Sequence, residues 1–192
     1  MKKATLLIAA ALSAVPSVAD EGMWTLYDLP QAVYSQMQQY GFTVPYDGLY
    51  SSKNALKNVV LNFGDFCSGV VVSADGLVFT NHHCGFSAIN AHSTVEHDYM
   101  KNGFFAKSFE DELPNEDLFV SFMVEQKDVT DKLSQMGIYS MKPSRQAEFV
   151  DSLENAWSKD VKAKDSTLRL ELKPFYEGNK YYATTYRDFR DV

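Results

Sequence analysis

The feature that most constrains this chain is the stretch at residues 66–85, FCSGVVVSADGLVFTNHHCG, which holds both of its cysteines. Two runs rich in β-branched and aromatic residues, 70–72 and 77–79, read as strands. The Ala-Asp-Gly sequence between them favours a tight turn, because glycine readily adopts the positive φ that short hairpins need. A hairpin brings its outer ends together, so we expect Cys67 and Cys84 to meet.

Two histidines, His82 and His83, precede Cys84, and we expect the second strand of the hairpin to end on them. A disulfide at Cys84 would hold the imidazole of His83 beside a covalent link. A rigidly held histidine at the end of a strand suits a general base. A lone histidine is more often structural, so the residues alone leave open that this pair is structural.

A metal site is the third interpretation, and it would draw on all four histidines: His82, His83, His92 and His97. Adjacent residues of a strand point in different directions, which separates the first two. The other two are five positions apart, whereas ligands on one helical face are usually four apart. We therefore expect no metal ion and no other cofactor.

Residues 1–19 have the features of a secretory signal peptide. Lys2 and Lys3 precede an apolar stretch, 4–15, that is too short to span a bilayer, and small residues precede a cut after Ala19. Removal of this segment takes away two lysines and no acidic residue, so the formal net charge changes from −7 to −9. An acidic chain argues against nucleic acid and anionic lipid as partners, and no later stretch predicts membrane insertion. Export also favours a disulfide over free thiols or thiolate ligands.

Periodicity and turn residues predict the other elements. We expect helices over 31–40 and 51–57, a helical turn over 85–92, a short helix from the capping-box sequence at 93–96, and a polar helix from 143 to about 164. We expect strands over 58–63, 118–124, 167–176 and 181–189, the last two as a hairpin. The chain ends in or just after a strand, which would leave an open sheet edge and suggests a truncated domain.

Longer motifs resemble the dipeptidyl-peptidase 7 and 11 family of bacterial serine exopeptidases. Proteases with the chymotrypsin-like fold carry a strand that ends in Thr-x-x-His-Cys, and residues 80–84, TNHHC, match it with Cys67 at a suitable spacing. Further matching blocks run from the mature start to the last residue: 20–24, 41–43, 49–51, 77–86, 93–99, 102–104, 112–114, 129–132, 174–176 and 189–192.

The resemblance implies a mainly β fold with helical insertions. It would comprise the first β-barrel of a chymotrypsin-like double-barrel protease and the start of a helical cap domain. The implied divisions are a signal peptide at 1–19, the N-terminal part of the catalytic domain at 20–142, a helical segment at 143–166, and a truncated hairpin at 167–192 that returns to the catalytic domain.

The resemblance also implies a periplasmic or cell-surface enzyme that releases dipeptides from the free N-terminus of oligopeptides and forms a homodimer when full-length. His83, directly before Cys84, would be the general base, with His82 as its neighbour. The Asp and Ser of the family's triad would lie beyond residue 192, and neither Ser68 nor Ser87 stands in a nucleophile motif. We therefore expect the chain alone to be inactive. The alternative is an exported binding module that kept the barrel and lost the catalysis.

Overall fold

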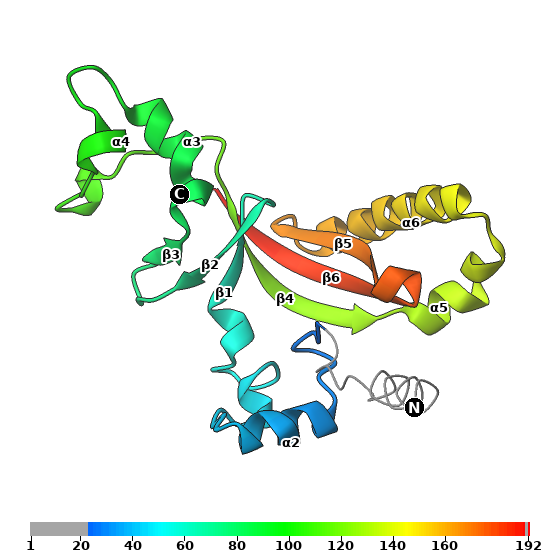
Figure 1. The fold of residues 1–192 in the computed structure, drawn as a ribbon. Helices are drawn as coiled ribbons and strands as arrows, with labels where there is room; N and C mark the ends of the chain where they lie inside the picture. Colours follow the sequence, from blue (N-terminus) through cyan, green and yellow to red (C-terminus); the bar gives the residue numbers. More distant parts are fainter. Residues whose placement is uncertain (1–22, 191) are drawn as a thin grey trace, which may run out of the picture.

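The computed structural model describes residues 23–190 and 192, and its strands form one antiparallel sheet in the order β3-β2-β1-β4-β6-β5 (Figure 1). The strands are β1 (Val60–Phe63), β2 (Cys67–Val71), β3 (Val78–Thr80), β4 (Val120–Asp128), β5 (Leu168–Phe175) and β6 (Lys180–Phe189). The helices are α2 (Gln31–Gln39), α3 (His82–His92), α4 (Tyr99–Asn102), α5 (Thr130–Gln135) and α6 (Pro143–Lys164). The predicted class, mainly β with helical insertions, is confirmed. The predicted signal peptide lies outside the described residues.

The sheet has a short-stranded part and a long-stranded part, which meet where β1 pairs with β4. In the short part, β1 pairs with β2 from Val60↔Val70 to Phe63↔Cys67. In the long part, β6 lies between β4 and β5. The open edge that we expected at the last strand is therefore wrong, because β6 is paired on both sides. The edges of the described sheet are β3 and β5.

Helix α6 covers the edge strand β5, and Figure 1 shows the two side by side. Ser158 Oγ donates a hydrogen bond to the carbonyl of Leu170 (3.0 Å), and the amide of Leu172 donates to Glu154 Oε2 (2.7 Å). These contacts satisfy backbone groups that an edge strand would otherwise present to solvent or to another chain. The predicted helix from 143 to about 164 is confirmed. Its first residue is a proline, which has no backbone N–H and therefore leaves no donor without a partner at that position.

Buried apolar side chains form three clusters along the described chain. One joins α5 and α6 to β5 and β6, and Leu133 and Ile138 are fully buried in it. A second surrounds α2 and includes Tyr34. The third lies between β1, β4 and the start of α3, and its buried members are Leu61, Phe63, Cys84 and Val120. This third cluster anchors the first turn of α3 to the sheet.

The hairpin is confirmed, but its second strand does not end on the histidines. β3 ends at Thr80, and His82 is already the first residue of α3. Asn81 has extended dihedrals, and its carbonyl accepts a hydrogen bond from the amide of Cys84 (2.9 Å). The Asn81 side chain makes no capping hydrogen bond, so the helix begins with this backbone bond, at a turn that the disulfide at Cys84 also holds. The helical turn predicted over 85–92 is confirmed as the remainder of α3.

Two predicted short helices are wrong. Over 51–57 the chain makes turns, with a single 3₁₀ turn at Leu56–Asn58. At 93–96 the Thr94 hydroxyl accepts a hydrogen bond from the backbone amide of His97 (3.0 Å). The next helix nevertheless begins only at Tyr99, and its N-cap is Asp98. Local side-chain caps form turns as readily as helices, so the capping pattern misplaced the start. None of the helices in the described part of the chain is both long and apolar enough to cross a membrane.

Candidate active site at the start of helix α3

A disulfide joins Cys67 to Cys84, as the sequence predicts, with their Cα atoms 6.0 Å apart. Cys67 is the first residue of β2, and Cys84 is the third residue of α3. Cys84 is buried against the cluster that includes Leu61 and Val120. The bond therefore fixes the first turn of α3 to the start of β2.

His83 lies directly before the buried half of this disulfide, and its side chain is exposed. A ring nitrogen of His83 and the two cysteine Sγ atoms all lie within 4.8 Å of one another. Among the residues that the structure describes, no side chain forms a hydrogen bond with the His83 ring. The disulfide at Cys84 therefore fixes the backbone of His83, while both nitrogens of its exposed ring are open to groups that approach from outside the described chain.

Each of the other three histidines has a contact of its own and does not join His83. The ring of His82 packs edge-on against Phe86, with centroids 6.1 Å apart. His92 is the last residue of α3, nine positions after His83. His97 stacks on Tyr99 at an interplanar angle of 17°. The four histidines do not gather into one ligand set within the described residues, and the group that forms there is His83 with the two cysteines.

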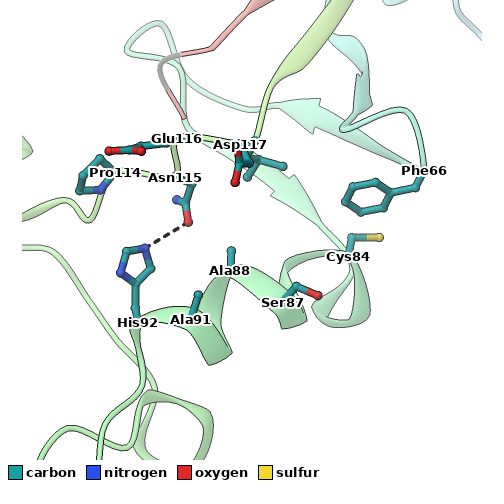
Figure 2. A pocket seen from close by; sticks show the side chains of 11 residues that line it. Phe66, Cys84, Ser87, Ala88, Ala91, His92, Pro114, Asn115, Glu116 and Asp117 are labelled. Atoms are coloured by element: carbon teal, nitrogen blue, oxygen red, sulfur yellow. Dashed lines mark hydrogen bonds between the residues drawn. The ribbon is translucent and has the colours of Figure 1, made fainter.

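A cavity of about 360 Å³ runs along the other side of α3, and Figure 2 shows the side chains that line it. His92 and Asn115 point toward each other in it, with Nε2 3.2 Å from Oδ1, which makes Nε2 the donor. This cavity was not predicted from the sequence. The sequence feature that could have indicated it is a row of small residues at the spacing of one helical face: Cys84, Ser87, Ala88 and Ala91. His83 does not line it.

A second feature missed from the sequence is a network of charges around Arg169. The guanidinium contacts Asp188 (Nε to Oδ2, 3.0 Å), Asp65 (Nη2 to Oδ1, 3.2 Å) and Glu171. Burial alone lowers the pKa of Arg169, but the hydrogen bonds with Asp188 and Glu171 outweigh it and raise that pKa. Asp65 stands two residues before Cys67, so the network ties the turn before the disulfide to β5 and β6. The sequence feature that could have indicated this network is the alternation of charged residues with leucines along 168–172.

The comparisons with known proteins agree on one family. The peptidase S46 family profile matches residues 19–192. The chain is 37% identical to dipeptidyl-peptidase 7 of Porphyromonas endodontalis over 196 residues, which are 100% of this chain and 24% of that protein. It is 38% identical over 204 residues to the Asp/Glu-specific dipeptidyl-peptidase of Porphyromonas gingivalis, covering 100% of this chain and 28% of that protein.

A crystal structure of Porphyromonas endodontalis DPP11 in complex with substrate superposes on this chain with a TM-score of 0.77 and 35% identity. The match covers 90% of this chain and 26% of that one. The chain thus spans about a quarter of the length of the curated relatives it matches. Because the family profile covers nearly all of the sequence, the chain belongs to the peptidase S46 family.

Proposed function

We propose that the protein is a serine-type dipeptidyl peptidase in which His83 is the general base. The observation that carries this proposal is the exposed His83 imidazole, whose backbone is anchored at the start of α3 beside the Cys67–Cys84 disulfide. Membership of the peptidase S46 family supports it, as do the names of the relatives, which are dipeptidyl peptidases.

In the proposed mechanism, the His83 imidazole takes up a proton and then gives it away. A serine hydroxyl would give its proton to one nitrogen of His83 while its oxygen attacks the scissile carbonyl, and the imidazolium would then protonate the leaving amine. An aspartate on the other nitrogen would fix the tautomer. We propose that both partners lie beyond residue 192. The chain alone would be inactive, because the loss of one member of such a triad costs nearly as much as the loss of all three.

The proposed substrates are oligopeptides with a free N-terminus, from which dipeptides are released. The proposal names no side-chain preference, because relatives called dipeptidyl-peptidase 7 and relatives called Asp/Glu-specific match at similar identity, 37–39% and 36–38%.

We further propose export to the periplasm or cell surface through the signal peptide at 1–19, and a homodimer of the full-length protein. A disulfide in the folded chain fits an oxidising compartment.

The test compares His83→Ala with His82→Ala in the full-length protein, by release of dipeptides from peptide substrates. Both side chains are exposed, so neither change should disturb folding. We expect His83→Ala to lower kcat by about 10⁴-fold or more, as loss of a triad base does. His82→Ala should keep a substantial part of the activity. Equal losses from the two variants, or wild-type activity in His83→Ala, would contradict the assignment of the base.

A further inference from the structure

We propose that the cavity beside α3 binds the leaving part of the peptide substrate, which is the part that follows the bond to be cut. This inference rests on the proposed function and adds a binding site to it. The cavity holds about 360 Å³, within the range of about 300–1,000 Å³ that is usual for ligand pockets. Its occupant is the side chain of the first residue of the leaving peptide.

Cys84 connects the cavity to the proposed base. The His83 side chain does not line the cavity, but one of its ring nitrogens lies within 4.8 Å of Cys84 Sγ, and Cys84 does line it. Figure 2 shows Cys84 and Phe66 at one end of the cavity, with His92 and Asn115 at the other. The end of the cavity at the disulfide is therefore the end that adjoins the proposed base.

The proposed reaction brings the leaving peptide to this end. When the peptide bond breaks, the nitrogen of the leaving residue takes its proton from the His83 imidazolium. That transfer requires a hydrogen bond of about 2.6–3.2 Å between this nitrogen and the ring. One extended residue spans about 3.3–3.6 Å, so the side chain of the first leaving residue can reach the cavity at Cys84.

The walls of the cavity favour an apolar side chain. Phe66 is 64% exposed, so contact between its ring and a substrate side chain would remove apolar surface from water. Glu116 and Asp117 also line the cavity, and none of the described lining residues is Lys or Arg, so an acidic side chain is repelled. The other apolar or small lining residues are Cys84, Ala88, Ala91, Pro114 and Leu118.

The cavity is open along several of its walls in the described part of the chain. Phe66, Ser87 and Asp117 all line it and are exposed. A substrate can therefore enter it without a change in the fold. The alternative occupant is a segment of the full-length protein from beyond residue 192, and the substrate preference of the enzyme separates the two.

The experiment measures dipeptide release by the full-length enzyme from peptides that differ only at the third residue, the first of the leaving peptide. We expect kcat/KM to be at least about tenfold higher with leucine there than with glycine, because hydrophobic pockets discriminate even a single methylene by about tenfold or more. A peptide with aspartate there should be cleaved more slowly than the glycine peptide. Equal rates for the leucine and glycine peptides, or an aspartate peptide cleaved as fast as the leucine peptide, overturn the proposal.

Two variants show whether the preference arises in this cavity. Ser87→Trp places a large ring on its wall, and Phe66→Ala removes part of the wall. Each should lower the leucine-to-glycine ratio by about threefold or more, because the substrate side chain loses apolar burial. Only the ratio is compared, so a general loss of activity cancels. The control is Ser152→Trp, which changes an exposed serine of α6 that does not line the cavity, and it should keep the wild-type ratio.

A wild-type ratio in both Ser87→Trp and Phe66→Ala overturns the proposal and favours the alternative occupant. If circular dichroism shows that Ser87→Trp does not fold, the ratio of Phe66→Ala decides alone. Failure of the proposed function has a different result, because the wild type would then release no dipeptide from any of the peptides, or His83→Ala would keep its activity. Failure of this site alone leaves dipeptide release intact and removes only the dependence on the third residue.

Discussion

Cys67 and Cys84 are separated by 17 positions in the sequence, yet their disulfide joins the first residue of β2 to the first turn of α3. The bond closes a loop that contains the whole β2–β3 hairpin. It restricts the unfolded chain, and a closed loop of about 15 residues contributes about 3 kcal/mol to the free energy of unfolding in the chain-entropy account. The hairpin should therefore depend on this bond more than the rest of the sheet does.

We predict that Cys67→Ser/Cys84→Ser lowers the free energy of unfolding by about 3 kcal/mol, measured by urea denaturation. The reduced wild type is the matched comparison, and it should lose a similar amount. A variant as stable as the oxidised wild type would show that the loop is already restricted in the unfolded chain.

The Arg169 network leads to a second prediction. Arg169 faces Asp65, Glu171 and Asp188, and the side chains of Glu171 and Asp188 are only 17% and 18% exposed. Arg169→Met would leave three carboxylates close together with no cation between them. We expect the free energy of unfolding to fall by about 2 kcal/mol, between the effects of surface and buried ion pairs.

The control for Arg169→Met is Arg145→Met, because Arg145 pairs with Glu148 on the surface of α6 at 73% and 66% exposure. Loss of such a pair should change the stability by less than about 0.5 kcal/mol. Urea denaturation of the two variants compares them directly. Equal effects would mean that the Arg169 network contributes no more than an ordinary surface pair.

The local parts of the fold could be predicted from the sequence, because they depend on neighbours along the chain. The hairpin, the disulfide and α6 follow from turn residues, cysteine placement and helical periodicity. Helix α5 was missed because it has only six residues, of which Leu133 alone is buried, too few to show a period. The start of α3 was misplaced because Asn81 reads equally well as the end of a strand or as a helix cap.

The contacts between distant segments could not be predicted from the residues alone. Arg169 meets Asp65 across 104 positions, and His92 meets Asn115 across 23. Both pairs depend on how strands and loops pack, which no local pattern encodes. The placement of β6 between β4 and β5 is of the same kind. His83 stood out only because it is adjacent to a cysteine and lies in a motif that resembles a known family.

The buried cluster around Leu133 gives a third prediction. Leu133 is 0% exposed and packs with Ile138 and Val150 between α5, α6 and the long strands. Leu133→Ala should lower the free energy of unfolding by about 3 kcal/mol, since buried leucine truncations cost roughly 2–5 kcal/mol. Leu77→Ala removes the same atoms from a side chain that is 57% exposed, and it should cost far less in the same urea experiment.

Lys180 holds the N-terminal segment of the described chain against β6 and gives a pH-dependent prediction. Its Nζ lies 2.7 Å from Asp28 Oδ2 and 3.0 Å from Asp128 Oδ2, and the Tyr182 hydroxyl donates to Asp28 (2.9 Å). The hydrogen bond from Lys180 lowers the pKa of Asp28. Burial raises the pKa of Asp128, but hydrogen bonds from Thr130 and Lys180 outweigh it, so that pKa is lowered as well.

Both carboxylates have a lower pKa in the folded protein than in the unfolded chain. Their contribution to stability is therefore complete above about pH 4, the unfolded value, and is lost as the pH falls through the folded values. We expect the free energy of unfolding to fall by less than about 1 kcal/mol on this account between pH 5 and pH 2, because Lys180 and Asp28 are 39% and 45% exposed. Lys180→Met should lower the stability at pH 7 and reduce this acid dependence. If the variant keeps the wild-type slope below pH 4, the acid sensitivity arises at other carboxylates, and Lys180 does not hold the N-terminal segment through its charge.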